Sequence, residues 1–118
     1  MSKIREAFSN SKAFIAFLTA GDPTADCTVN YILEMERAGA DLIEIGIPFS
    51  DPTAEGVVIQ EASLRALEGG ITTERVFQIV EEVRKQSQVP LALMTYLNPV
   101  FYYGYEAFFS RCHSLGVD

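Results

Sequence analysis

The sequence has few of the residues that most often hold metals or form disulfide scaffolds. Its 118 residues include one histidine, His113, and two cysteines, Cys27 and Cys112, which lie far apart without metal-ligand spacing. A chain of this size forms a core without disulfides, so both cysteines are expected to be free, packed thiols of a cytosolic protein. His113 lies on an expected helix and is interpreted as a surface or packing residue. No metal site is predicted.

Basic residues are also scarce, and long apolar runs are absent. Nine Lys and Arg residues against sixteen Asp and Glu give a net charge of −7, which disfavours nucleic acids and anionic membranes as partners. No stretch approaches the roughly 20 apolar residues of a membrane span. The polar start of the chain, residues 1–6, lacks the apolar segment of a signal peptide. A cytoplasmic location is therefore expected.

What the sequence does contain is an alternation of strand-like and helix-like segments. Short apolar runs predict strands at about 13–19, 41–47 and 90–96. Apolar residues at helical spacing predict helices between and after them, at about 23–38, 57–68, 73–88 and 105–115. This order predicts an α/β fold of parallel strands joined by helical crossovers. A (β/α)8 barrel and a doubly wound open sheet both fit, although no Gly-x-Gly-x-x-Gly or Walker motif supports nucleotide binding.

Capping residues and helix breakers place the expected boundaries. Asp22 is expected to cap the first of these helices, with Pro23 in its first position. Thr72 or Thr73 is expected to cap the helix that begins at about 73. Asn98-Pro99 is expected to end the third strand and to open a loop. The last helix is expected to bury four residues: Phe108, Phe109, Cys112 and Leu115.

The expected second strand has two unlike faces, because side chains alternate along a strand. One face carries three isoleucines: Ile43, Ile45 and Ile47. The opposite face carries Leu42, Glu44 and Gly46. The isoleucine face is expected to be covered by helices, and the other face to hold a carboxylate that is partly removed from water.

A short sequence pattern that occurs twice bears on the length of the fold. Ala38-Gly-Ala-Asp41 closes a helix and opens the second strand, and Leu115-Gly-Val-Asp118 has the same form after the last helix. A fourth strand is therefore expected to begin at Val117. A complete eightfold barrel needs roughly 200–250 residues. Residues 1–118 are thus interpreted as one incomplete barrel domain of about three βα units.

Side chains suited to chemistry gather just after the second strand. Glu44, Ser50, Asp51 and Glu55 fall within twelve residues, at the carboxyl edge where parallel α/β folds collect ligands and catalytic groups. Two carboxylates in different environments can divide acid and base roles. Structural interpretations also fit. Glu44 could form an ion pair, Asp51 could serve only a turn, and Glu55 could be solvated or cap the next helix.

A long segment carries a resemblance to a known family. The segment Leu42-Ile-Glu-Ile-Gly-Ile-Pro-Phe-Ser-Asp-Pro-Thr-Ala-Glu-Gly56 resembles the signature of tryptophan synthase α subunits. The turn at 17–23, the segments 59–62 and 64–67, Gly70 and the segment 95–99 match in order and spacing, so the resemblance covers essentially the whole chain. Glu55 stands where the family often has Asp, and Val57 where it usually has Pro.

The resemblance implies a (β/α)8 lyase that cleaves indole-3-glycerol phosphate to indole and glyceraldehyde 3-phosphate in tryptophan biosynthesis. It implies that Glu44 shuttles the proton and that Glu55 holds the indole N–H. It places Phe17 and Tyr96 in the indole pocket. Because the family's phosphate site comes from later strand–loop units, little or no turnover is expected from 118 residues alone.

The resemblance also implies a partner. Asp51 falls on the loop that signals to a β subunit, and Asn98-Pro99 lies in the region of that contact. Pyridoxal phosphate is expected on the β subunit of an α2β2-type complex, and no cofactor on this chain. The alternative hypothesis is a non-catalytic partial barrel that self-associates through its sheet edges or only docks on a β-type subunit.

Overall fold

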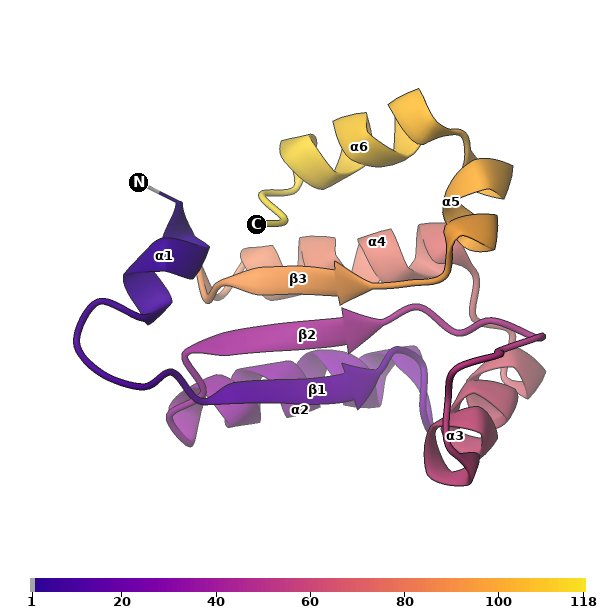
Figure 1. Ribbon diagram of the computed structural model, residues 1–118, viewed down its shortest axis with the longest axis horizontal. Coiled ribbons are helices and arrows are strands. Elements are labelled where there is room, and N and C mark those ends of the chain that lie inside the picture. Colours follow the sequence, from indigo (N-terminus) through magenta and orange to yellow (C-terminus); the bar gives the residue numbers. More distant parts are fainter. Residues whose placement is uncertain (1) are drawn as a thin grey trace.

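The computed structural model describes residues 2–118, which alternate between helices and strands as the sequence predicts (Figure 1). The strands are β1 (Ile15–Thr19), β2 (Leu42–Gly46) and β3 (Leu91–Met94). The helices are α1 (Lys3–Ala7), α2 (Ala25–Arg37), α3 (Val57–Glu68), α4 (Thr73–Arg84), α5 (Leu97–Tyr103) and α6 (Tyr105–Ser114). Within the part of the chain described, no helix combines the length and apolar character needed to cross a membrane.

The three strands form one sheet in the order β1-β2-β3, and both pairings are parallel, as predicted. In the register, Phe17 of β1 lies beside Glu44 of β2, which lies beside Ala92 of β3. The carboxyl ends of all three strands therefore meet at one edge. The loop that leads to α3 and the start of α5 lie at this edge, and α1 lies at the opposite, amino-terminal end of the strands (Figure 1).

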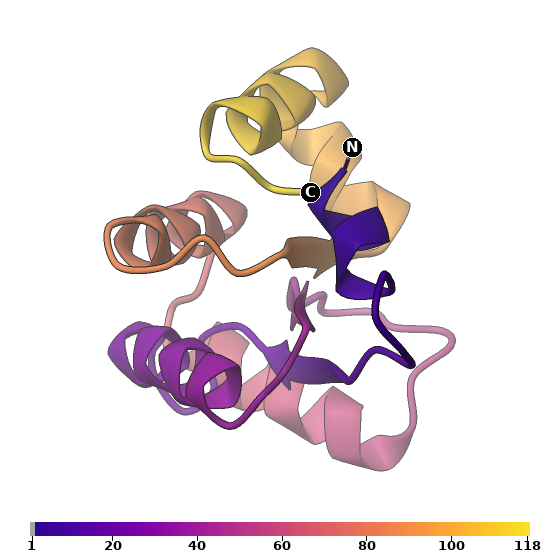
Figure 2. The ribbon, with the colours of Figure 1, turned by 90° about the vertical axis from the view of Figure 1, so that its left-hand side faces the viewer.

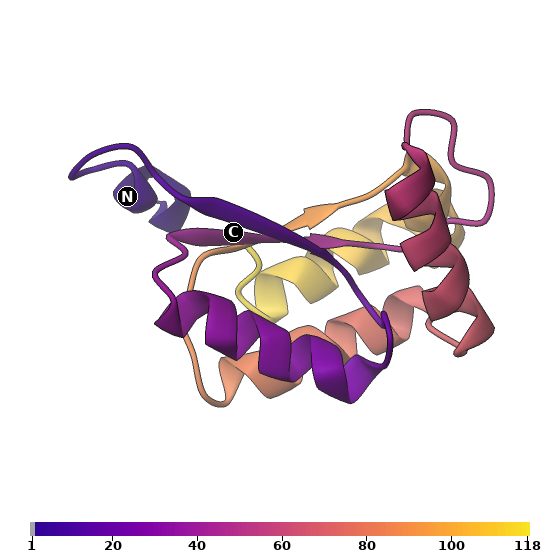
Figure 3. The ribbon, with the colours of Figure 1, turned by 90° about the horizontal axis from the view of Figure 1, so that it is seen from below.

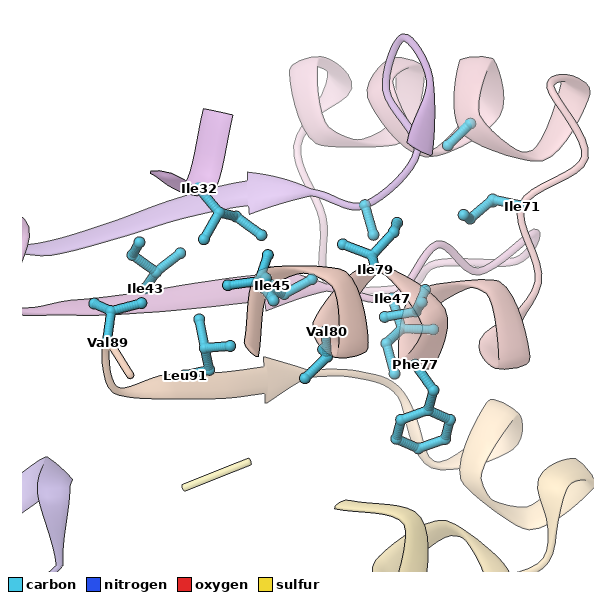
Figure 4. Packing of buried hydrophobic residues seen from close by; sticks show 14 of the residues in the cluster. Ile32, Ile43, Ile45, Ile47, Ile71, Phe77, Ile79, Val80, Val89 and Leu91 are labelled. Carbon is cyan, nitrogen blue, oxygen red and sulfur yellow. The ribbon is translucent and has the colours of Figure 1, made fainter. Parts of the chain in front are cut away.

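One face of the sheet packs against α2 and α4, which lie side by side on that face (Figures 2 and 3). Ile43 and Ile45 of β2 have no exposed surface, and Ile47 is 6% exposed. Together with Ile32 of α2 and Val80 of α4 they form the centre of the hydrophobic core (Figure 4). The prediction that helices cover the isoleucine face is confirmed.

Helix capping is confirmed at one predicted position and corrected at the other. Thr72 caps α4, and its side-chain oxygen accepts the backbone N–H of Arg75 at 3.1 Å. Asp22 does not cap α2. Thr24 does, by accepting the N–H of Cys27 at 3.1 Å, because α2 begins at Ala25 rather than at Pro23.

The segment after β3 is a helix where the sequence analysis expected a loop. Asn98-Pro99 lies in the first turn of α5, whose N-cap is Tyr96. N–H groups in the first turn have no intrahelical partner, so proline is tolerated there and does not break the helix. The strand β3 is also shorter than expected, because Tyr96 already leads into this helix.

Two further expectations are wrong, one for the end of α4 and one for the buried face of α6. The helix α4 ends at Arg84 instead of at about 88. On α6, Phe108 is buried as expected, but Phe109 is 63% exposed. Adjacent residues on a helix point about 100° apart, so one phenylalanine facing α4 leaves its neighbour directed away from the core.

The sequence pattern that occurs at 38–41 and 115–118 corresponds to a repeated arrangement of hydrogen bonds. The N–H of Asp41 donates to Phe14 O at 2.9 Å, and the Asp41 carboxylate accepts the N–H of Phe14 at 2.7 Å. At the second corner, the N–H of Asp118 donates to Leu91 O at 2.8 Å and its carboxylate accepts the N–H of Leu91 at 3.1 Å. Each aspartate therefore holds the start of its segment against the preceding strand.

Candidate functional site

A pocket of about 150 Å³ lies at the carboxyl edge of the sheet. Its lining comes from all three strand ends, from the segment that leads into α3 and from α3 itself. The lining residues are Phe17, Thr19, Gly46, Ile47, Ala54, Glu55, Ile59, Ser63, Met94, Thr95 and Tyr96. Pockets for drug-sized ligands occupy roughly 300–1,000 Å³, so this part of the site suits a small ring.

The aromatic ring of Phe17 occupies this edge because the neighbouring strand leaves room for it. Gly46 pairs with Thr19, next to Phe17 on the same face. A Cβ atom at Gly46 would lie 2.8 Å from Cζ of Phe17, which is closer than carbon atoms pack. Glycine at this position therefore lets the Phe17 ring lie across β2 and form one wall of the pocket.

Tyr96 joins the end of β3 to the loop that carries Glu55. Its hydroxyl oxygen accepts the backbone N–H of Ala54 at 2.9 Å. Its ring stacks on Phe49 with 5.5 Å between the ring centroids. These two contacts hold the loop over the pocket, and they place Tyr96 in a supporting role as well as in the wall.

Glu55 lines the pocket and is half-buried. The side chain of Gln60 donates to the backbone oxygen of Glu55 at 2.7 Å, which fixes the residue just before α3. The N-cap of α3 is Gly56, and no side chain caps this helix. The alternative interpretation of Glu55 as a helix cap is therefore wrong.

Glu44 lies deeper along the strand than the pocket lining. It is half-buried on the face of β2 that no helix covers, and it lies between Phe17 of β1 and Ala92 of β3. Gly46 is the next residue of β2 on the same face. Among residues 2–118 its carboxylate forms no ion pair and no hydrogen bond to the protein. The alternative interpretation as a structural ion pair thus finds no support in the described residues.

A second groove of about 430 Å³ collects the residues expected at a partner contact. Asp51, Asn98 and Pro99 all line it, although they come from the segment after β2 and from α5. The Ser50 hydroxyl donates to the Asp51 carboxylate at 2.6 Å, and Tyr102 at the rim is 87% exposed. The structure therefore brings these three residues together, away from the pocket that holds Glu55.

The sequence analysis missed an ion pair that supports the same edge. The guanidinium of Arg65 on α3 donates twice to the Asp22 carboxylate, at 2.9 Å each. These hydrogen bonds hold the pKa of Asp22 below its usual value. The two residues are 43 positions apart, so no local pattern could reveal the pair.

The remaining candidates for chemistry lie elsewhere. His113 is exposed on α6, and both cysteines are half-buried free thiols. Burial raises the pKa of the Cys112 thiol. Across residues 2–118, no three His, Cys, Asp or Glu side chains are grouped so as to hold a metal ion.

A larger cavity, of about 440 Å³, lies between the starts of α2 and α4. Its walls include Thr24, Asp26, Glu74, Arg75 and Gln78, and it contains no aromatic ring. None of the carboxylates predicted for catalysis reaches it. We therefore place the candidate site in the smaller pocket, where an acidic group and two aromatic rings converge.

Comparison with known proteins shows which family the chain matches. The sequence model of the tryptophan synthase alpha chain family matches residues 3–118. The tryptophan synthase alpha chain of Lacticaseibacillus casei is 50% identical over 117 residues, which cover 99% of this chain and 44% of that relative. That of Geotalea uraniireducens is 50% identical and matches all of this chain but 46% of its own length. The chain thus spans about half the length of the curated relatives it matches.

Solved structures show the same fold. The crystal structure of tryptophan synthase subunit alpha from Legionella pneumophila superposes with a TM-score of 0.95 at 40% identity, over 100% of this chain and 47% of that chain. A chain of the tryptophan synthase complex from Pyrococcus furiosus gives a TM-score of 0.85 at 44% identity, over 90% of this chain and 43% of that chain. The prediction of a partial (β/α)8 barrel is confirmed by this likeness.

Proposed function

Because this chain belongs to the tryptophan synthase alpha chain family, we propose that it contributes the indole end of the site that cleaves indole-3-glycerol phosphate. The products are indole and glyceraldehyde 3-phosphate, and the reaction is a step of tryptophan biosynthesis in the cytoplasm. On this proposal, residues 1–118 form a single incomplete barrel domain. The substrate's phosphate is bound by later units of the barrel, in the part of the relatives that these residues do not match.

One observation carries the proposal: an acidic side chain and two aromatic rings converge on a pocket at the carboxyl edge of a parallel sheet. Phe17 and Tyr96 present rings against which a flat bicyclic ring stacks. Glu55 supplies a carboxylate that accepts the ring N–H. A pocket of this composition suits indole better than a sugar or a nucleotide phosphate.

The proposed reaction is the reverse of an aldol addition, and it needs no oxidant or reductant. A carboxylic acid delivers a proton to C3 of the indole, which makes the ring an electron sink. A base removes the proton of the glycerol hydroxyl beside the C3–carbon bond. That bond breaks, its electron pair returns to the ring, and the hydroxyl carbon becomes the aldehyde of glyceraldehyde 3-phosphate.

We assign the proton shuttle to Glu44. Its carboxylate has no ion-pair partner among the described residues, so no neighbouring cation competes with a ligand for it. Its half-buried position beside Phe17 directs it towards the space next to the ring. Glu55 holds the ring N–H and stabilises the positive charge that develops on the protonated ring. Pyridoxal phosphate is assigned to a β-type partner, and no cofactor to this chain.

The second candidate function is docking on a β-type subunit without catalysis. The observation in its favour is the groove that joins Asp51, Asn98 and Pro99 beside the exposed ring of Tyr102. On this proposal, Asp51 and α5 make the contact of an α2β2-type complex. Self-association through the free edges of β1 and β3 is the remaining alternative, since an unpaired strand edge is a template for pairing.

The test is indole release from indole-3-glycerol phosphate. The chain is assayed alone, with a β-type subunit, and fused to the carboxyl-terminal part of the Lacticaseibacillus casei relative that it does not match. Glu44→Gln and Glu55→Gln remove the two proposed groups. Glu68→Gln, at the exposed end of α3, is the matched control.

We expect the fusion to release indole, Glu44→Gln to lower the rate at least a hundredfold, and Glu68→Gln to leave it unchanged. A fusion that folds and retains full activity in Glu44→Gln would contradict the assignment of the proton shuttle. Specific binding to the β-type subunit by a fusion without indole release would support the docking function instead.

A further inference from the structure

Among residues 2–118, four hydroxyl residues are buried, and they fall into two pairs. Thr19 is 8% exposed, Thr28 0%, Ser63 9% and Ser87 7%. A buried hydroxyl without a hydrogen bond is unfavourable, because it loses water and gains nothing in return. The partners of these four groups therefore show which of them serve the fold.

Two of the hydroxyls are satisfied by the protein itself. The Thr28 hydroxyl donates to Thr24 O and accepts the N–H of Gly21, both at 2.9 Å. The Ser87 hydroxyl donates to the Glu36 carboxylate at 2.5 Å. Both groups bridge elements of the structure, which is the ordinary role of a buried hydroxyl.

Thr19 and Ser63 differ from this pair. Within residues 2–118, neither hydroxyl forms a hydrogen bond to another protein group. Every side-chain oxygen that is fully buried in this part of the chain does have a hydrogen-bond partner. Each hydroxyl oxygen therefore keeps some accessible surface. Both residues line the pocket that contains Glu55.

The positions of the two residues relate them to Glu55. Thr19 is the last residue of β1 and pairs with Gly46, and α3, which carries Ser63, packs against β1. Glu55 lies just before α3. Three hydrogen-bonding groups thus surround the pocket from β1, α3 and the preceding loop, whereas Phe17 and Tyr96 supply its aromatic walls.

We propose that the Thr19 and Ser63 hydroxyls form a ligand-binding pair that recognises the N–H edge of a ring held in this pocket, and so set the orientation in which the ring enters. The proposal rests on the proposed function, because it takes the ligand to be an indole. A hydroxyl both accepts and donates, so one of the pair accepts a share of the ring N–H while the other donates to the Glu55 carboxylate. A ring without N–H leaves the three groups unpaired and is bound less well.

The experiment compares two ligands of nearly the same shape. Indole has the N–H group, and benzothiophene replaces it with sulfur. Dissociation constants for both are measured by NMR titration on the wild-type chain, on Thr19→Val, on Ser63→Ala and on the double variant. Thr95→Val is the matched control, because the Thr95 hydroxyl also belongs to the pocket but already donates to Tyr96 O at 2.8 Å.

We expect the wild-type chain to prefer indole, and the double variant to lose about tenfold of that preference. Each single variant loses part of it, and Thr95→Val changes the affinity for both ligands by the same factor. Because the preference compares two ligands on the same folded protein, a loss of stability in a variant does not mimic the effect.

Two results would overturn the inference, and they differ in what else they affect. If the wild-type chain binds indole and the double variant keeps the full preference for indole over benzothiophene, the two hydroxyls do not recognise the ring. The proposed function then stands. If the wild-type chain binds neither ligand, the pair and the indole pocket both fail.

Discussion

The two faces of the sheet differ in burial, in polarity and in what packs against them. On the helix-covered face, Ile43 and Ile45 have no exposed surface and contact α2 and α4. On the open face, Glu44 is half-buried with no ion pair among residues 2–118, and Gly46 leaves room for the Phe17 ring. Residues one position apart in β2 thus lie in the hydrophobic core on one side and beside the candidate site on the other.

The difference explains how the fold can hold half-buried polar groups on its open face and remain stable. The free energy of folding comes largely from burial of the apolar face, which scales with the area removed from water. Unpaired polar groups at the other face lower stability without removing that contribution. Substitutions on the two faces should therefore have different consequences, with the greatest loss of stability on the covered face.

The largest effect is expected on the covered face. Ile45→Ala removes a fully buried side chain and should lower the free energy of unfolding by about 2–5 kcal/mol. Glu44→Gln, one residue away, should change it by less than about 1 kcal/mol. Urea unfolding followed by circular dichroism measures both. Equal losses in the two variants would contradict the division between the faces.

The close approach at Gly46 should show a smaller effect that combines stability and binding. Gly46→Ala puts a methyl group 2.8 Å from the Phe17 ring and should cost about 1–3 kcal/mol of unfolding free energy. The displaced ring should also weaken indole binding. Phe17→Leu in the same chain should restore much of the lost stability without restoring affinity. An unchanged affinity in Gly46→Ala would argue against Phe17 as a pocket wall.

The ion pair behind the pocket should contribute less, with a defined pH dependence. Asp22→Asn should lower stability by roughly 0.5–1 kcal/mol at pH 7, because Arg65 is partly exposed. The pKa of Asp22 is lowered in the folded chain, so its contribution is full above the unfolded value near 3.8 and is lost as pH falls through the folded value. The difference between wild type and variant should therefore shrink only in acid. A difference that is constant from pH 7 to pH 2 would contradict it.

An effect as small as that of the ion pair is expected at Tyr96. Tyr96→Phe keeps the ring but removes the oxygen that accepts the N–H of Ala54, and should cost about 0.5–1 kcal/mol. Amide hydrogen exchange at Ala54 should quicken, and indole binding should weaken modestly through the freed loop. Phe49→Leu, which removes only the stacked ring, separates the hydrogen bond from the stacking. Unaltered exchange at Ala54 would show that the loop is held by other contacts.

Much of this fold could be predicted from local patterns. Apolar alternation in β2 predicted its two faces, and apolar residues at helical spacing predicted α4, in which Val76, Ile79, Val80 and Val83 are buried. The failures lie where local signals compete. Asn98-Pro99 favours both a break and a first helical turn, and only the packing of α5 decides between them.

The site was less predictable than the fold. Strand-edge position and resemblance nominated Glu44, Glu55, Phe17 and Tyr96, and these four remain predictions that only binding and activity can decide. The hydroxyls of Thr19 and Ser63 could not be found from sequence, because a threonine at a strand end and a serine in a helix are ordinary. What distinguishes them is the missing protein partner, which only the folded structure reveals.

The most direct test of the division between the two faces is a two-dimensional ¹H–¹⁵N NMR titration of this chain with indole. We expect chemical-shift changes at the amides of Thr19, Gly46, Glu55 and Tyr96, and none at the start of α2 or α4. Changes that cluster instead around Thr24 and Arg75, at the larger cavity between these helices, would place the ligand on the wrong side of the sheet and contradict the account.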